Sequence, residues 1–208
     1  MTPENSARLS AEDRREQILA AASIVFGERG YAGGTTDAIA TQAGVSQAYV
    51  VRMFGGKANL FREAALRASD RVAATFRDTI AGFTGDESVA DKRLALALAY
   101  ANLVSDRGLL LTLMHLFALG HDATLAPLAR ECFLRTYRIV RDEAGMTGPE
   151  ASDFVAQGML TNVLLAMRMP DAEDEPAAME LMTCTFGDQT TDLIQISRHQ
   201  PPISGRGR

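Results

Sequence analysis

The sequence predicts an all-α protein in which a small amino-terminal three-helix unit is joined to a larger helical domain. Apolar residues recur at helical spacing along almost the whole chain, and no segment shows the apolar–polar alternation that is typical of a strand. Glycine and proline clusters separate the helical segments. Residues 1–77 carry ten Lys/Arg and eight Asp/Glu, a balance of +2, whereas residues 78–208 carry eleven and eighteen, a balance of −7. The first unit is therefore the part better suited to approach an anion.

The first helix is expected over residues 10–29. Ser10 and Asp13 form a capping-box pattern in which Asp replaces the usual Glu. Gly30 is expected to end this helix, because glycine commonly follows the last helical residue. The core-facing stripe of the helix consists of Ile18, Ala22, Val25 and Phe26.

Two short helices follow, over 37–43 and 47–53. Thr35 and Ser46 are suitable N-caps for them, and Gly44 lies in the turn, where a positive φ is needed. Two short helices joined by a tight glycine-containing turn are typical of a helix-turn-helix, whose second helix enters the major groove of DNA. The same spacing also fits an ordinary helical hairpin in a bundle, so the pattern alone leaves both interpretations open.

The second short helix and its surroundings have the side chains that DNA recognition requires. Gln and Arg can hydrogen-bond base edges, and Tyr and Ser hydroxyls can bond phosphates. The backbone N–H groups that open the first short helix favour an anion such as a phosphate, and a lysine at the start of the following helix adds a positive charge. The candidate DNA-binding residues are Thr35, Thr36, Ser46, Gln47, Ala48, Tyr49, Arg52 and Lys57.

The stretch REQILAAASIVFGERGYAGGTTDAIATQAGVSQAYVVRMFGGKANLF resembles the TetR family of bacterial transcriptional repressors. The resemblance covers about residues 10–65 and includes the Thr-x-x-x-Ile-Ala…Ala-Gly-Val-Ser segment, a recognition helix ending in Phe54, and Lys57-x-x-Leu60-Phe61. This sequence departs from the family in two places. The recognition helix ends in Val51-Arg52-Met53-Phe54 where the family often has Tyr-x-Tyr-Phe, and Gly56 stands where Ser or Thr is usual.

The resemblance implies a homodimer that binds a palindromic operator in double-stranded DNA, acts as a repressor, and is released by a small-molecule effector. Four regions are then expected. They are a DNA-binding domain over 1–56, with the helix-turn-helix at 35–54; a connecting helix and linker over 57–84; an effector-binding and dimerisation domain over 85–187; and a tail over 188–208. The end of the tail has no core residues, so disorder is expected there.

Further helices are expected over 57–80, 89–104, 108–119, 123–144, 150–168 and 176–186. The helix over 150–168 has apolar or small residues on more than one face, so it needs two packing partners. One partner is its own core. The resemblance implies that the other is a second subunit, in a four-helix bundle with the last helix, and full burial within one chain is the alternative. The candidate dimer-interface residues are Phe154, Gly158, Thr161, Leu165, Met182 and Phe186.

Apolar and aromatic side chains of the carboxy-terminal domain are candidates for an effector pocket, and their character favours a lipophilic effector. A Met and aromatic stripe at helical spacing is more often plain core. The histidine among them is either a hydrogen-bonded core residue or a polar handle for a ligand. The candidates are Leu110, Met114, His115, Phe117, Phe133, Tyr137, Phe154 and Met159.

Other functional classes lack their sequence signatures. There is no nucleophile elbow, phosphate loop or plausible catalytic carboxylate pair, so we predict neither an enzyme nor a cofactor. The histidines lack metal-site spacing, and Cys132 and Cys184 are expected to be buried free thiols. No run reaches the roughly 18 apolar residues of a membrane span, and no secretory signal is present, so we expect no membrane association and residence in the cytoplasm. The departures at Val51, Met53 and Gly56 leave one alternative, a helical interaction module with weakened or lost sequence-specific DNA binding.

Overall fold

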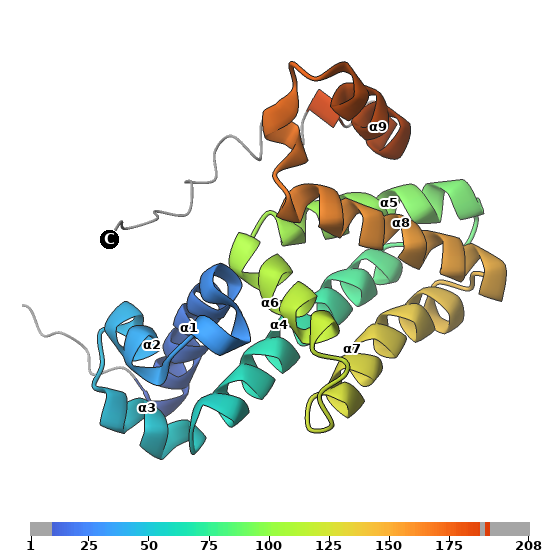
Figure 1. Cartoon of the computed structure of the whole chain (residues 1–208). Helices are drawn as coiled ribbons and strands as arrows, with labels where there is room; N and C mark the ends of the chain where they lie inside the picture. The colour runs from blue at the N-terminus through green and yellow to red at the C-terminus, as the bar shows by residue number, and fades with distance from the viewer. Residues whose placement is uncertain (1–9, 188–189, 192–208) are drawn as a thin grey trace, which may run out of the picture.

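A computed structural model describes residues 10–187 and 190–191, and within these ranges the chain is built from helices (Figure 1). The all-α prediction is confirmed. The expected disordered tail over 188–208 lies outside the described residues, apart from 190–191. The elements are α1 (Ala11–Gly33), α2 (Thr36–Ala43), α3 (Gln47–Phe54), α4 (Lys57–Ala81), α5 (Val89–Val104), α6 (Arg107–Ala118), α7 (Ala126–Arg138), the π turn η1 (Ile139–Glu143), α8 (Gly148–Ala166), the short 3₁₀ helix η2 (Met169–Ala172) and α9 (Pro176–Phe186).

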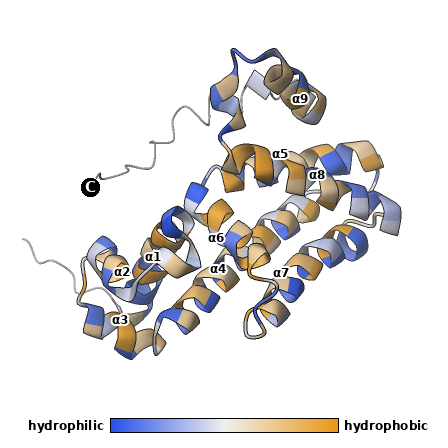
Figure 2. Ribbon diagram, in the orientation of Figure 1, coloured by the Kyte–Doolittle hydropathy of each residue, from blue (hydrophilic) through white to orange (hydrophobic). Residues whose placement is uncertain are grey.

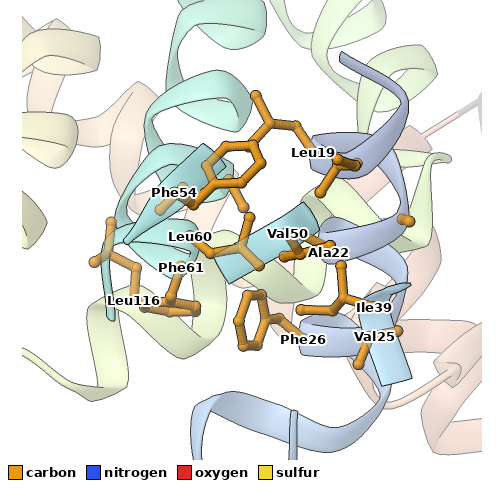
Figure 3. Packing of buried hydrophobic residues seen from close by; sticks show 14 of the residues in the cluster. Leu19, Ala22, Val25, Phe26, Ile39, Val50, Phe54, Leu60, Phe61 and Leu116 are labelled. Carbon is orange, nitrogen blue, oxygen red and sulfur yellow. The ribbon is translucent and has the colours of Figure 1, made fainter. Parts of the chain in front are cut away.

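Two hydrophobic cores follow one another along α4. The first core lies between α1, α2, α3 and the amino-terminal half of α4, and Leu116 of α6 packs into it (Figure 3). The second core lies between the carboxy-terminal half of α4 and helices α5, α6 and α8. Helix α4 contributes Phe61 to the first core and Phe76 to the second. The three-helix unit and the larger helical domain are therefore joined by one continuous helix.

Helix α6 is the second element that both cores share. It packs against α1, α4, α5, α7 and α8, and both α5 and α6 are largely hydrophobic along their length (Figure 2). This composition fits the burial of α6 among several helices, whereas Leu94 and Leu98 of α5 are exposed. In the part of the chain that the structure describes, no single helix is both long enough and apolar enough to cross a membrane.

The helix expected over 123–144 is wrong at its start and changes form near its end. The Asp122 carboxylate accepts the backbone N–H groups of Thr124 at 2.8 Å and Leu125 at 3.0 Å, and this local turn delays α7 until Ala126. The last residues form η1 instead of an α-helix. The other predicted helices agree with the structure to within two residues at each end, except that α1 continues beyond a break at Gly30.

The two cysteines differ in their surroundings. Cys132 is buried in the first core, as expected. The expectation is wrong for Cys184, which is exposed on α9. Helix α9 lies beyond α8 at the far end of the molecule from α1–α3 in Figure 1, and its buried residues are Ala178 and Met182. One face of α9 therefore packs on the chain while the other remains open.

Candidate nucleic-acid interface and effector cavity

Both short helices of the predicted helix-turn-helix begin at a side-chain cap. Thr35 Oγ1 accepts the N–H of Ala38 at 3.1 Å at the start of α2, and Ser46 Oγ accepts the N–H of Tyr49 at 3.2 Å at the start of α3. Gly44 ends α2 in the left-handed conformation, at φ 64°, which a residue with a Cβ rarely adopts. The caps and this glycine fix where each helix begins and how sharply the chain turns.

Helix α3 has one buried face and one exposed face. Val50 and Phe54 are buried in the first core, and the Arg15 guanidinium lies 4.7 Å from the centre of the Phe54 ring. The exposed residues of the helix are Gln47, Ala48, Val51 and Arg52. The buried anchors hold the helix so that its amide and guanidinium groups face outward, which is the arrangement needed to hydrogen-bond base edges.

Two polar side chains of α3 already have partners inside the unit. Gln47 Nε2 donates to Thr36 Oγ1 at 3.1 Å, which links α3 to α2. The Arg52 guanidinium lies 5.2 Å from the centre of the half-buried Tyr49 ring. These contacts restrict the rotamers of Gln47 and Arg52, so these side chains would lose less conformational entropy on contact with a ligand.

Lys57 makes two contacts within the chain that link α4 to α1. Its ammonium donates to the carbonyl of Ala32 at 2.9 Å and lies 4.9 Å from the centre of the Tyr31 ring. Both partners belong to the last residues of α1. Lys57 therefore ties the start of α4 to the end of α1.

Val51 is a surface residue that sequence reasoning did not include among the DNA contacts. Its side chain is 41% exposed on α3, in the same helix turn as Arg52. An exposed aliphatic group on a recognition helix can contact the methyl group of thymine. The sequence feature that could have identified Val51 as a contact residue is its departure from the family pattern at this position.

Helices α1 and α6 approach closely along five small residues and one histidine, which we call the α1–α6 contact: Ser23, Gly27, Gly30, Gly108, Thr112 and His115. A Cβ added at Gly108 would lie 3.2 Å from the backbone carbonyl carbon and oxygen of Ser23. Thr112 Oγ1 donates to the same carbonyl oxygen at 3.3 Å, and His115 Nε2 lies 3.3 Å from the carbonyl oxygen of Gly27. The three-helix unit is thus joined to α6 by backbone-to-backbone packing.

A cavity of about 50 Å³ lies in the second core, between α4, α5, α6, α7 and α8. Four of the eight effector-pocket candidates line it: Phe117, Phe133, Phe154 and Met159. Leu110, Met114 and Tyr137 instead pack in or against the surrounding core. His115 does not reach the cavity, because it faces α1 in the α1–α6 contact, where it is a hydrogen-bonded interface residue.

The polar groups of the cavity were missed by sequence reasoning. Tyr100 and Asn162 both line it, and the Tyr100 hydroxyl donates to Asn162 Oδ1 at 2.8 Å. Burial raises the pKa of Tyr100 to about 12, although the hydrogen bond to Asn162 opposes this shift. Asn162 is 3% exposed, which is unusual for an asparagine. An asparagine within the apolar helix 150–168 was the available signal.

The dimer-interface candidates fall into two groups. Phe154, Thr161 and Met182 are buried within the chain, whereas Gly158, Leu165 and Phe186 are half-buried. The first three already belong to the chain's own packing, so they add little area to a contact between subunits. Other apolar residues of α8 and α9 are exposed, namely Leu160, Val163, Met167 and Leu181.

Helices α2 and α3, joined by the turn at Gly44 and packed on the first core, have the geometry of a helix-turn-helix. A family model described as "Bacterial regulatory proteins, tetR family" matches residues 18–64, from α1 into α4. Over 73 residues the chain is 37% identical to the "HTH-type transcriptional activator FasR" of Mycolicibacterium smegmatis, a match that covers 35% of this chain and 33% of that protein. The chain thus matches about a third of the length of this curated relative.

Solved structures share the whole fold. A transcriptional regulator from Rhodococcus sp. Rha1 has a TM-score of 0.59 at 22% identity, covering 87% of this chain and 96% of that one. The "multidrug binding protein EbrR complexed with imidazole" has a TM-score of 0.56 at 23% identity, covering 89% of this chain and 97% of that one. The amino-terminal part of the chain is therefore similar to the TetR family of bacterial regulatory proteins, and the solved structures share the fold beyond it.

Proposed function

We propose that this chain is a homodimeric repressor that binds a palindromic operator through α3 and is released by a small, lipophilic effector. The observation that carries the proposal is the exposed face of α3. Gln47 and Arg52 point outward there, while Val50 and Phe54 hold the opposite face in the first core. The DNA-binding domain is assigned to residues 1–56, the connecting helix and linker to 57–84, and the effector and dimer domain to 85–187.

The proposed DNA contacts divide by chemistry. Gln47 and Arg52 read base edges, and a good bidentate pair contributes about 1–3 kcal/mol of discrimination against a wrong base. Ala48 and Val51 offer apolar contact to thymine methyl groups. The phosphate contacts, which position the protein but do not read sequence, come from Thr35, Thr36, Ser46, Tyr49 and Lys57.

The exposed apolar residues of α8 and α9 support the dimer. Leu160, Val163 and Met167 recur at helical spacing on α8, and Leu181 is exposed on α9. Pairing these two helices with those of a second copy makes a four-helix bundle. Two recognition helices then meet half-sites about 34–36 Å apart, or a multiple of that distance, along one face of the duplex.

Effector binding is supported by the apolar cavity of the second core. Helices α4 and α6 belong to both this core and the first, so a change around the cavity reaches α3 through packed elements. EbrR, which shares this fold, is named a multidrug binding protein, and this supports small-molecule binding by the same fold. An effector releases the operator only if it binds more tightly to a state whose recognition helices are wrongly spaced.

Activation is a second candidate mode of regulation, because the relative from Mycolicibacterium smegmatis is named an activator. Its similarity covers 73 residues, a third of that protein. The two modes differ in the sign of the response at one promoter. A reporter gene behind the chain's own operator should rise when the chain is deleted if it represses, and should fall if it activates.

The test of the proposed function is retention of genomic DNA fragments by the purified protein, followed by sequencing. Enrichment of a shared palindrome is the expected result. Arg52→Ala should lose about 1–3 kcal/mol of affinity for that palindrome, whereas Arg130→Ala, which removes the same charge from an exposed site on α7, should leave affinity unchanged. Salt-sensitive retention without a shared sequence would contradict operator binding and favour the interaction-module alternative.

A further inference from the structure

Two hollows of the helical domain share one wall. The inner one is the cavity of about 50 Å³ in the second core. The outer one is a groove of about 210 Å³ between α5, α8 and α9. Tyr100, Phe154 and Gly158 line both hollows. These three residues therefore form the wall that the two hollows share.

The inner cavity is too small for an effector as it stands. A water molecule occupies about 30 Å³ in the liquid, whereas small-molecule sites occupy about 300–1,000 Å³. The cavity and the groove together approach the lower end of that range. An effector of ordinary size must therefore displace the shared wall and occupy both spaces.

The shared wall consists of packed aromatic rings at Tyr100 and Phe154, and it has free space beside the backbone at Gly158. The Phe76 ring packs edge-on against the rings of Tyr100 and Phe154, with centroid distances of 5.9 and 5.8 Å. At Gly158 an added Cβ would meet no atom within 4 Å. The weak point of the wall is therefore the backbone of α8 at Gly158, next to the Phe154 ring.

The inner cavity contains a hydrogen-bond donor without a strong acceptor. Asn162 is 97% buried, and its carbonyl oxygen accepts from Tyr100. Its amide nitrogen has Met159 Sδ at 3.9 Å, a weak acceptor, for two N–H donors. A buried donor left without a good partner costs about 1–3 kcal/mol, so a ligand that supplies an acceptor gains that free energy.

The lining restricts the chemistry of that ligand. The polar side chains on the inner cavity are Tyr100, Thr136 and Asn162, and all three are uncharged. A charged group placed there would lose its hydration without gaining an opposite charge. The ligand group that meets Asn162 is therefore neutral, and the rest of the molecule is apolar.

We propose that Asn162 is the polar anchor of the effector site and that Tyr100, Phe154 and Gly158 form the gate through which the effector enters from the α5–α8–α9 groove. The occupant is an elongated, mostly apolar molecule with one neutral acceptor, such as a carbonyl oxygen, that binds Asn162 Nδ2. Tyr100 positions the amide by holding its oxygen. The inference rests on the proposed function for the role of the ligand as an effector.

The test uses the full chain and two dyes that differ by one acceptor. One is a dimethylaminonaphthalene that carries a propionyl group, whose emission reports the polarity around its carbonyl, and the other is the same naphthalene without the ketone. Dissociation constants are measured by fluorescence for the unmodified chain, Asn162→Leu, Tyr100→Phe, Gly158→Leu and Gly158→Ala. Thermal unfolding and size exclusion report whether each variant is folded and keeps its oligomeric state.

Saturable binding of the ketone dye, at least about fivefold tighter than that of its ketone-free partner, is the expected result. Asn162→Leu should remove this preference without weakening the ketone-free dye. Gly158→Leu should weaken both dyes at least about tenfold with no loss of thermal stability, since it fills the gate, while Gly158→Ala stays within about twofold of the unmodified chain. Tyr100→Phe should reduce the preference and leave binding of the ketone-free dye unchanged.

Three outcomes would overturn the inference: no saturable binding of either dye, a ketone preference that survives Asn162→Leu, or unchanged binding in a folded Gly158→Leu variant. The DNA-retention experiment separates this inference from the proposed function. Dye binding with the expected dependences but no operator enrichment supports the site and refutes the regulator. Operator enrichment with dye binding that ignores Asn162 and Gly158 refutes the site alone.

Discussion

The first core of this chain is packed around fully buried aromatic rings, whereas the second borders a cavity. Phe26 and Phe61 are fully buried in the first core and meet edge-on at 5.0 Å between ring centroids (Figure 3). The second core surrounds a cavity and holds a buried amide with a weak partner. Complete packing fixes one arrangement of side chains, and incomplete packing allows a core to adapt. The packing of the first core therefore suits a fixed orientation of α3, and the packing of the second core suits the binding of a small molecule.

The largest expected effect is a difference between two phenylalanine truncations. Phe26→Ala should cost about 3–5 kcal/mol of unfolding free energy, because its neighbours cannot close the space. Phe154→Ala should cost at least about 1 kcal/mol less, since one side of its ring already borders empty volume and has fewer atoms to lose. Urea denaturation followed by circular dichroism measures both. Equal losses would contradict the difference in filling.

A smaller effect is expected from Tyr100 at high pH. Its pKa rises from 10 to about 12 on folding, so the folded state holds the proton more tightly. The stabilisation is fully present below about pH 10 and is lost as the pH rises through about 12, a decline on the order of 2–3 kcal/mol. Tyr100→Phe should lack this decline. The free energies of unfolding of both proteins across that interval measure it, and parallel curves would show that Tyr100 is not shielded from water.

The same substitution at two glycines should change stability in opposite directions. Gly108→Ala places a Cβ 3.2 Å from backbone atoms of Ser23, and separating α1 from α6 costs about 1–3 kcal/mol. Gly158→Ala meets nothing within 4 Å and should gain up to about 1 kcal/mol from helix propensity. Thermal unfolding of the two variants side by side gives both signs. If Gly108→Ala were more stable than the unmodified chain, α1 and α6 would be able to move apart at little cost in free energy.

The smallest expected losses of stability come from removing N-cap side chains, because a cap stabilises its own helix end whichever core lies beside it. Thr35 caps α2 beside the first core, and Ser88 caps α5 beside the second. Alanine at either position should cost about 1 kcal/mol. Thr183→Ala, at an exposed α9 position, serves as the control. Clearly unequal cap losses, measured in urea, would show that core filling also controls the helix ends.

The helix-turn-helix was predictable because its signals are local. The caps at Thr35 and Ser46 and the turn at Gly44 act within four residues, so their spacing in the sequence is their spacing in the structure. Each signal identifies a helix end without reference to the rest of the chain. The start predicted for the helix over 123–144 was wrong because a competing local signal, the turn at Asp122, occupies the same residues.

The cavity was predictable only in part, because its residues meet across long sequence separations. Phe117 and His115 lie two residues apart on α6, a helix apolar on every side, so the sequence does not show which of them faces inward. The structure points Phe117 to the cavity and His115 to α1. The pairing of Tyr100 with Asn162 spans 62 residues and has no local signature.

The length of helix α4 determines how far one of its ends moves when the other end tilts. It runs unbroken for 25 residues, from Lys57 beside α3 to Ala81 beside the second core. At 1.5 Å per residue its length is about 37 Å, so a tilt of about 3° at one end displaces the other by about 2 Å. A hydrogen bond to a base edge is lost over a smaller displacement than this. In a symmetric pair the two displacements add, so a very slight rotation is enough to take both copies out of register with the DNA helical repeat.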